Sequence, residues 1–154
     1  MQKRRYAVCG VSSRAIEMYI GPMLRKFQHC AELVAMLDID PLRFQVCKDK
    51  IPEANEVPCY LASDFNKMLE ETKPDALLVV CMDRFHAEYI IRGLECGLDV
   101  ISEKPMTTNT EDALRVLGHT IEFRGGVGTH GDVVLLTLAG GDAIGRVGHA
   151  EHLA

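Results

Sequence analysis

The chain has 154 residues, of which 47% are hydrophobic and 25% charged, and its formal net charge is −5. This length suits one domain with its own core. The acidic balance disfavours a nucleic-acid partner, and the short basic run at residues 3–5 flanks the first predicted strand. No membrane-spanning or secretory segment is expected, because polar residues interrupt the first apolar run after Gly10.

The six cysteines form no C-x-x-C pair, and several lie within apolar strand or helix patterns. A buried free thiol behaves as a small hydrophobic group. We therefore predict reduced thiols and a cytoplasmic protein rather than a disulfide framework.

Strand and helix patterns alternate along the first three quarters of the chain, which predicts an α/β fold. The expected architecture is a doubly wound parallel sheet of the Rossmann type, with three α-β-α layers. We predict strands near 5–9, 32–37, 59–61, 76–81 and 99–102, separated by helices near 13–27, 41–50, 64–73 and 85–96, with a loop at 51–58. Ser63 would cap the third helix, and Pro74 would end it.

Two helix starts carry capping signals. Asp40 before Pro41 predicts an acceptor followed by a proline in the first turn. Thr108 and Glu111 match a capping box for the helix after the last strand. The predicted domain covers residues 1–118, and residues 119–154 form a glycine-rich tail in which only 133–139 look regular. The apolar run at 133–136 would need covering, so self-association into a homo-oligomer is expected.

The turn after the first strand predicts a dinucleotide site. Residues 10–15 read Gly-Val-Ser-Ser-Arg-Ala, close to the G-x-G-x-x-G/A fingerprint,. Gly10, Val11, Ser12, Ser13 and Arg14 would place small residues and a helix N-terminus against a pyrophosphate. The alternative is a tight turn without a ligand.

Asp38 ends the second strand, where a carboxylate accepts from an adenosine ribose. A carboxylate there favours NAD over NADP, whereas Arg43 nearby could accommodate a 2′-phosphate, so NADP stays open. The alternative is that Asp38 only caps a turn.

Further polar residues follow the fourth and fifth strands. His86, with Cys81 and Met82 before it, could shape the nicotinamide end of a groove, although a histidine in a first helical turn is more often structural. Glu103 and Lys104 follow the strand at 99–102. A lysine at this sheet edge could bond a substrate hydroxyl and assist proton transfer, or could merely pair with Glu103 or Asp83.

Histidines in the tail could be metal ligands, but no helical pattern and no third ligand support a site. No metal site is therefore predicted. They are His130, beside Asp132, and the pair His149 and His152.

Together, the turn at 10–15, Asp38, His86 and the run Glu103-Lys104-Pro105 resemble the Gfo/Idh/MocA family of oxidoreductases over about residues 5–117. The resemblance implies a Rossmann domain that binds NAD or NADP, with Lys104 contacting substrate and nicotinamide. It also implies hydride transfer to or from a hydroxyl of a sugar-like or polyol-like substrate.

The chain departs from the family pattern after residue 118. Family members carry a C-terminal α/β domain with an aspartate and a histidine about one helical turn apart, and no such segment is found. We hypothesise that the middle of the gene is lost at about Gly118, which predicts weak or no turnover by this chain alone. The alternative function is a non-catalytic module that binds a dinucleotide or a partner.

Overall fold

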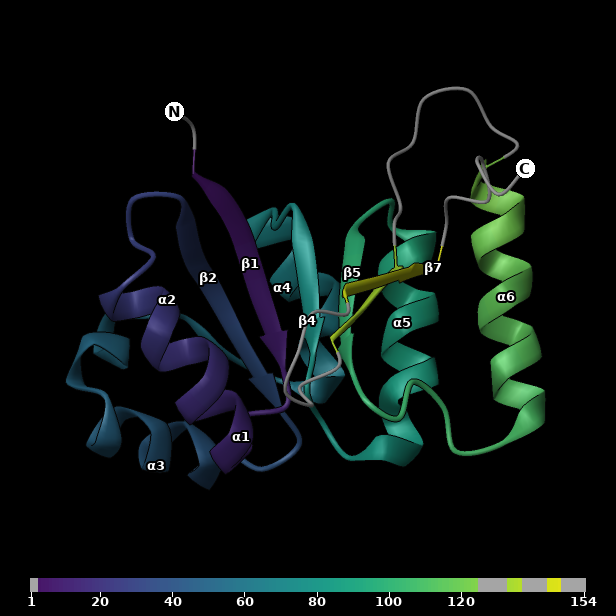
Figure 1. The fold of residues 1–154 in the computed structure, drawn as a ribbon. Helices are drawn as coiled ribbons and strands as arrows, with labels where there is room; N and C mark the ends of the chain where they lie inside the picture. Colours follow the sequence, from purple (N-terminus) through teal and green to yellow (C-terminus); the bar gives the residue numbers. More distant parts are fainter. Residues whose placement is uncertain (1–2, 125–132, 137–143, 148–154) are drawn as a thin grey trace.

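The computed structural model describes residues 3–124, 133–136 and 144–147. Its single sheet has seven strands in the order β3-β2-β1-β4-β5-β6-β7 (Figure 1). All neighbouring strands are parallel except the last pair, β6 and β7. The strands are β1 (Arg4–Cys9), β2 (Ala31–Asp38), β3 (Cys59–Leu61), β4 (Ala76–Val79), β5 (Asp99–Glu103), β6 (Val133–Leu136) and β7 (Ile144–Val147).

Helices cover both faces of this sheet, as predicted for a doubly wound fold. The helical elements are α1 (Ser13–Ala15), the π-helix η1 (Ile16–Ile20), α2 (Gly21–Arg25), α3 (Leu42–Lys50), α4 (Phe65–Thr72), α5 (His86–Glu95) and α6 (Thr110–Arg124), with short 3-10 turns η2 (Pro52–Glu56), η3 (Ala62–Asp64) and η4 (Asp83–Phe85). The apolar residues of α1, η1, α2 and α3 share one core cluster, and those of α4, α5 and α6 share the other. The predicted fold class is therefore confirmed.

The two central strands are buried because both of their faces are covered. Every residue of β4 is buried, as are residues 7–9 of β1. Such strands read as continuous apolar runs rather than alternating ones. The predicted core face of α5 is also confirmed, since Ala87, Ile90, Ile91 and Leu94 are all buried.

Local predictions held at one helix start and failed at another. The Asp40 carboxylate accepts from the Leu42 N–H at 2.9 Å, as expected of a capping group. At α6, however, Asn109 rather than Thr108 is the capping residue, because its side-chain oxygen accepts from the Asp112 N–H at 2.8 Å. The segment predicted as loop contains a 3-10 turn, η2.

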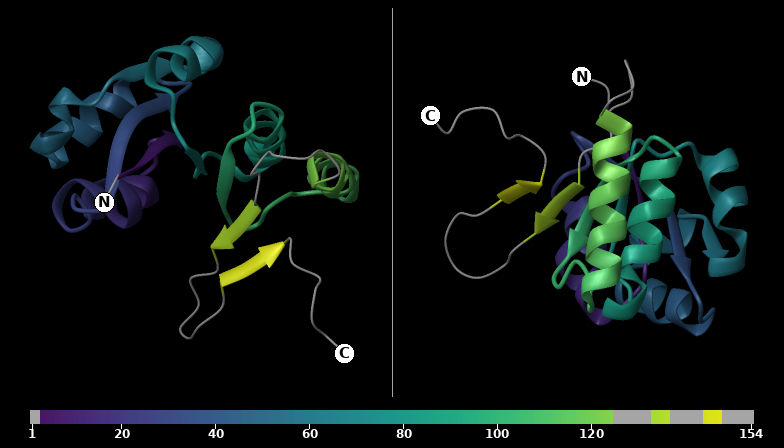
Figure 2. Two further views of the ribbon diagram at one scale, coloured as in Figure 1. Left: turned by 90° about the horizontal axis from the view of Figure 1, so that it is seen from above. Right: turned by 90° about the vertical axis from the view of Figure 1, so that its right-hand side faces the viewer.

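The C-terminal part of the described chain extends the sheet. Helix α6 continues through position 118 to Arg124, and β6 pairs in parallel with β5. Figure 2 shows α5 and α6 side by side and the β6–β7 pair at one edge of the fold. The boundary at 118 stays a prediction, and it falls within a helix.

The strand order places a crevice where the chain reverses direction. From β1 the chain moves outward to β2 and β3, and then returns to the other side of β1 through β4 and β5. In open parallel sheets, ligands bind at this reversal, beyond the carboxyl ends of the strands. No helix among the described residues is long and apolar enough to cross a membrane.

Candidate functional site: a cavity at the carboxyl edge of the sheet

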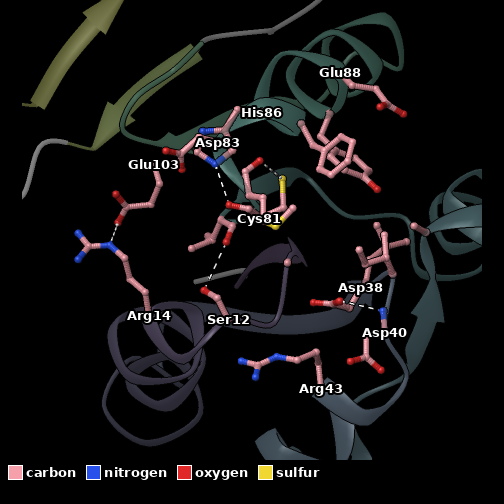
Figure 3. Close-up of a pocket in the computed structure, with 18 of the residues that line it drawn as sticks. Ser12, Arg14, Asp38, Asp40, Arg43, Cys81, Asp83, His86, Glu88 and Glu103 are labelled. Carbon is pink, nitrogen blue, oxygen red and sulfur yellow. Dashed lines mark hydrogen bonds and ion pairs between the residues drawn. The ribbon is translucent and has the colours of Figure 1, made fainter. Parts of the chain in front are cut away.

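A cavity of about 580 Å³ opens at this reversal point (Figure 3). Its volume is typical of ligand-binding sites. It gathers every residue predicted to form the site except Val11 and Ser13, namely Gly10, Ser12, Arg14, Asp38, Arg43, Cys81, Met82, His86, Glu103 and Lys104. Segments far apart in sequence therefore meet at one edge, as the sequence predicted.

Gly10 allows the turn after β1 to approach the segment after β4 at the cavity. Its φ is +95°, and a Cβ placed on it would lie 2.4 Å from both the Cα and the backbone nitrogen of Cys81. A side chain would therefore need a strained backbone and a displaced neighbour. Ser12 then begins the helix, because its Oγ accepts from the Ala15 N–H at 3.1 Å.

Asp38 and Arg43 hold the glycine turn from opposite sides. Asp38 Oδ2 accepts from the Val11 N–H at 2.6 Å, and Arg43 Nε donates to the Val11 carbonyl at 2.9 Å. Asp38 Oδ1 accepts from the Asp40 N–H at 3.0 Å. Both side chains are half-buried and still line the cavity, so each shapes the turn and faces the space beside it.

At the other end, Glu103 is buried and bonded on both oxygens. Arg14 Nε donates to Oε1 at 2.6 Å, the Tyr19 hydroxyl donates to the same oxygen, and the Lys104 N–H donates to Oε2 at 3.2 Å. Burial raises the pKa of Glu103, but these donors together outweigh it and hold the pKa below its usual range,. Burial and the same bond raise the pKa of the Tyr19 hydroxyl well above its ordinary value.

Lys104 leaves β5 with its side chain exposed at the cavity, and the Lys104–Pro105 peptide bond is cis. The alternative reading, an ion pair with Glu103 or Asp83, is not what the structure shows. Glu103 pairs with Arg14, and within residues 3–124 no salt bridge of the Lys104 amine is present.

His86 is almost completely buried, with 1% of its surface exposed. Its Nδ1 lies 2.7 Å from the Pro105 carbonyl oxygen and its Nε2 lies 3.0 Å from that of Cys81. The ring thus connects the end of β4 with the turn that follows Lys104. This geometry favours the structural alternative over a direct role at the nicotinamide.

The cysteine that lines the cavity is a neutral thiol. Burial raises the pKa of Cys81 to about 12, and all six cysteines are free. Because the thiolate is the reactive form, this raised pKa disfavours Cys81 as a nucleophile,.

Sequence reasoning missed two side chains of α5, one of η4 and one of η1. Phe85, Tyr89 and Arg92 line the cavity at near-helical spacing, and the Arg92 guanidinium lies 4.0 Å from the centre of the Phe65 ring. The sequence shows the near-helical spacing of these three residues. It does not show that the face they form lines the cavity. Tyr19 of η1 lies five positions after Arg14, so α-helical periodicity predicts that its side chain points away from Arg14,.

No group of three or more potential metal ligands occurs among the residues that the structure describes. The histidines at 130, 149 and 152 and Asp132 lie outside those residues.

Comparison with known proteins decides the family. A family model described as "Oxidoreductase family, NAD-binding Rossmann fold" (Gfo/Idh/MocA) matches residues 4–123. The chain belongs to this family. The resemblance drawn from the glycine turn, Asp38, His86 and the Glu-Lys-Pro run is confirmed, and at the level of the family so is the prediction of a NAD-type cofactor.

Curated relatives are much longer than this chain. YteT of Bacillus subtilis (strain 168), named provisionally as an oxidoreductase, is 45% identical over 109 residues, which are 71% of this chain and 26% of that protein. Inositol 2-dehydrogenase of Paracoccus denitrificans (strain Pd 1222) is 27% identical over 88 residues, 56% of this chain and 25% of that protein. The chain thus spans about a quarter of the curated relatives it matches.

Solved structures confirm the fold. The WlbA dehydrogenase of Bordetella pertussis, crystallised with NADH and UDP-GlcNAcA, matches with a TM-score of 0.70 and 23% identity, over 88% of this chain and 37% of that one. The scyllo-inositol dehydrogenase of Lactobacillus casei, crystallised with NAD(H) and scyllo-inositol, matches with a TM-score of 0.68 and 20% identity, over 86% and 36% of the two chains.

Proposed function

We propose that this chain binds an NAD-type dinucleotide in the cavity at the carboxyl edge of its sheet. The bound nicotinamide would exchange a hydride with a hydroxyl-bearing carbon of a sugar-like or polyol-like substrate. One observation carries the proposal: the glycine turn, a strand-end carboxylate and an exposed lysine line one cavity where the strand order reverses,.

Different residues along the cavity would contact different parts of the dinucleotide. The capped helix start at Ser12 offers backbone N–H groups to the pyrophosphate. Gly10 contributes its lack of a side chain, since its own N–H donates to the Leu37 carbonyl at 2.8 Å. Asp38 accepts from the adenosine ribose, and Arg43 holds the glycine turn in place. Cys81 and Met82 line the wall formed by the end of β4.

NAD is proposed over NADP because two carboxylates, Asp38 and Asp40, line the adenosine end of the cavity. Their charge would repel a 2′-phosphate. Arg43 is the cation that could offset this repulsion, and its Nε donates to the Val11 carbonyl at 2.9 Å, which orients its guanidinium on the glycine turn.

Lys104 is proposed as the residue that contacts both the nicotinamide and the substrate. Its amine is exposed at the cavity, without a salt bridge among the described residues, so it is available to bond a substrate hydroxyl and to assist the proton transfer that accompanies hydride transfer,. The names of relatives that act on inositols and nucleotide sugars support this substrate class.

Titration of the full chain with NADH by calorimetry tests the binding proposal. We expect saturable heat for the wild type and at least tenfold weaker binding for Asp38→Ala, which removes the carboxylate. A thermal shift with millimolar NADH gives a second readout. Absence of both heat and shift would remove the dinucleotide from this cavity.

A non-catalytic dinucleotide-binding module is the second candidate, because the same cavity residues could bind the cofactor without turnover. Turnover with a panel of polyols and sugars separates the two candidates. Turnover that is lost in Lys104→Ala supports the enzyme, whereas NADH binding without turnover supports the module. Self-association stays a prediction, which the sedimentation of the chain can test.

A further inference from the structure

Glu103 lines the cavity, but its bonds join the helix after the glycine turn to the turn that carries Lys104. Only 5% of its surface is exposed. One of its oxygens is shared by Arg14 and Tyr19, and the other accepts from the Lys104 N–H. A buried carboxylate with three protein donors has little remaining capacity to bond a cofactor. Its bonds instead connect the helix after the glycine turn with the turn that carries Lys104.

The π-helix η1 explains how Tyr19 reaches this carboxylate. Arg14 and Tyr19 are five residues apart, so on a regular α-helix their side chains would point about 140° away from each other. The Gly21 N–H, however, bonds the Ile16 carbonyl, which is the five-residue spacing of a π turn. The wider turn holds more residues and brings both side chains toward one face. Single π turns of this kind are frequent at functional sites.

The groups around Glu103 also favour its ionised form. Among the described residues, the charged or titratable side chains that act on its carboxylate are Arg14 and Tyr19. Both donate to it, and Arg14 adds a positive charge, so the ionised form is the stable one. The carboxylate is therefore present as an acceptor for the Lys104 N–H at neutral pH.

We propose that Glu103 is a positioning residue, which holds the Lys104 turn against the glycine-turn helix through Tyr19 and Arg14. The π turn at residues 16–20 is the element that makes this connection. The inference deepens the proposed function and rests on it, because it assigns Glu103 to placing Lys104 at the nicotinamide end rather than to binding the cofactor.

The first test needs no cofactor. In ¹⁵N-labelled full chain, the amide proton of Lys104 should follow the titration of Glu103, with a midpoint below the ordinary glutamate range. In Tyr19→Phe we expect this midpoint to rise by about one pH unit, since a donor to the ionised form is lost. Tyr60→Phe is the matched control, because Tyr60 donates to the exposed Glu71 at 2.8 Å, away from Glu103. It should leave the Lys104 titration unchanged.

The second test compares NADH with ADP-ribose, which lacks the nicotinamide. If Glu103 acts through Lys104, Tyr19→Phe should weaken NADH binding about three- to tenfold and change ADP-ribose binding less than twofold. Equal weakening of both ligands, or of neither, would overturn the positioning role. Should Tyr19→Phe not fold, Arg14→Lys removes the Nε donor, keeps the charge and is read in the same way.

The two tests separate the two proposals. If the wild type binds neither NADH nor ADP-ribose while the Lys104 amide still follows Glu103, the dinucleotide proposal fails. The positioning role of Glu103 at the Lys104 turn is then still supported. The positioning role is overturned if the Lys104 amide does not titrate, or if its midpoint is the same in Tyr19→Phe. This holds whatever the cofactor result.

Discussion

The two ends of the cavity are built in different ways. At the adenosine end, Asp38, Asp40 and Arg43 come from one short segment, are half-buried, and Asp38 and Arg43 bond the Val11 backbone in the glycine turn. At the Lys104 end, the buried groups come from η1, α5 and β5, and Glu103 bonds residues more than 80 positions away. The side chains of the first end are therefore close together in sequence, whereas those of the second are brought together only by tertiary packing.

The largest effect is expected at Gly10, which lies between the two ends. Gly10→Ala combines a positive φ with contacts of 2.4 Å to the Cys81 backbone, and we expect it to lower the free energy of unfolding by about 3 kcal/mol or more,. Chemical denaturation measures the loss. NADH affinity should fall as well, because β1 and β4 would separate.

Gly97→Ala is the matched control for the backbone term. Gly97 has a φ of +73°, and a Cβ there meets no atom within 4 Å. We expect the free energy of unfolding to fall by roughly 1 kcal/mol, because only the left-handed conformation of the backbone disfavours alanine there. Equal losses in the two variants would show that the approach to Cys81 is not what requires glycine at position 10.

The next effect tests the packed end alone. His86→Leu removes the ring that lies between the Pro105 and Cys81 carbonyls, so at least one of them loses its donor,. We expect the free energy of unfolding to fall by about 2 kcal/mol. His29→Leu, at an exposed position, should change stability by less than about 0.5 kcal/mol,. A loss below about 1 kcal/mol for His86→Leu would mean that the ring does not hold the Lys104 turn.

The same difference between the ends separates what the sequence could predict from what it could not. Strand ends, the glycine turn, Asp38 and Lys104 followed from apolar runs and their spacing, because these signals depend on near neighbours. Tyr19 was out of reach, since α-helical periodicity turns it away from Arg14 and nothing in residues 16–20 announces a π turn. The cap at Asn109 was misassigned because three adjacent polar residues compete for that position.

Asp38→Asn tests the local end. It removes the charge but keeps an acceptor for the Val11 N–H, so the fold should persist while NADH binds about tenfold more weakly,. NADPH should be affected less, because the repulsion of its 2′-phosphate is relieved. Calorimetric titration with both cofactors measures the change in preference.

Asp75→Asn is the control, since Asp75 also accepts a backbone N–H, that of Arg5 at 2.8 Å, but at the start of β4 rather than at the cavity. It should leave both affinities unchanged. A parallel fall for NADH and NADPH in Asp38→Asn would assign Asp38 to holding the glycine turn only.

The smallest effect is the contribution of Glu103 to acid stability. Its pKa in the folded chain lies below the ordinary value of 4.5, because the donors from Arg14, Tyr19 and Lys104 outweigh the effect of burial. A carboxyl group of this kind stabilises the fold fully above its unfolded value, and its contribution disappears as pH falls through the folded value. The difference in unfolding free energy between wild type and Glu103→Gln should therefore be constant from pH 7 to about 5 and shrink by about 1 kcal/mol below that.

Glu71→Gln, at an exposed partner of Tyr60, should show a much smaller change over the same range,. A difference for Glu103→Gln that does not depend on pH would mean that the donors do not favour the ionised form, and the electrostatic distinction between the two ends would then disappear.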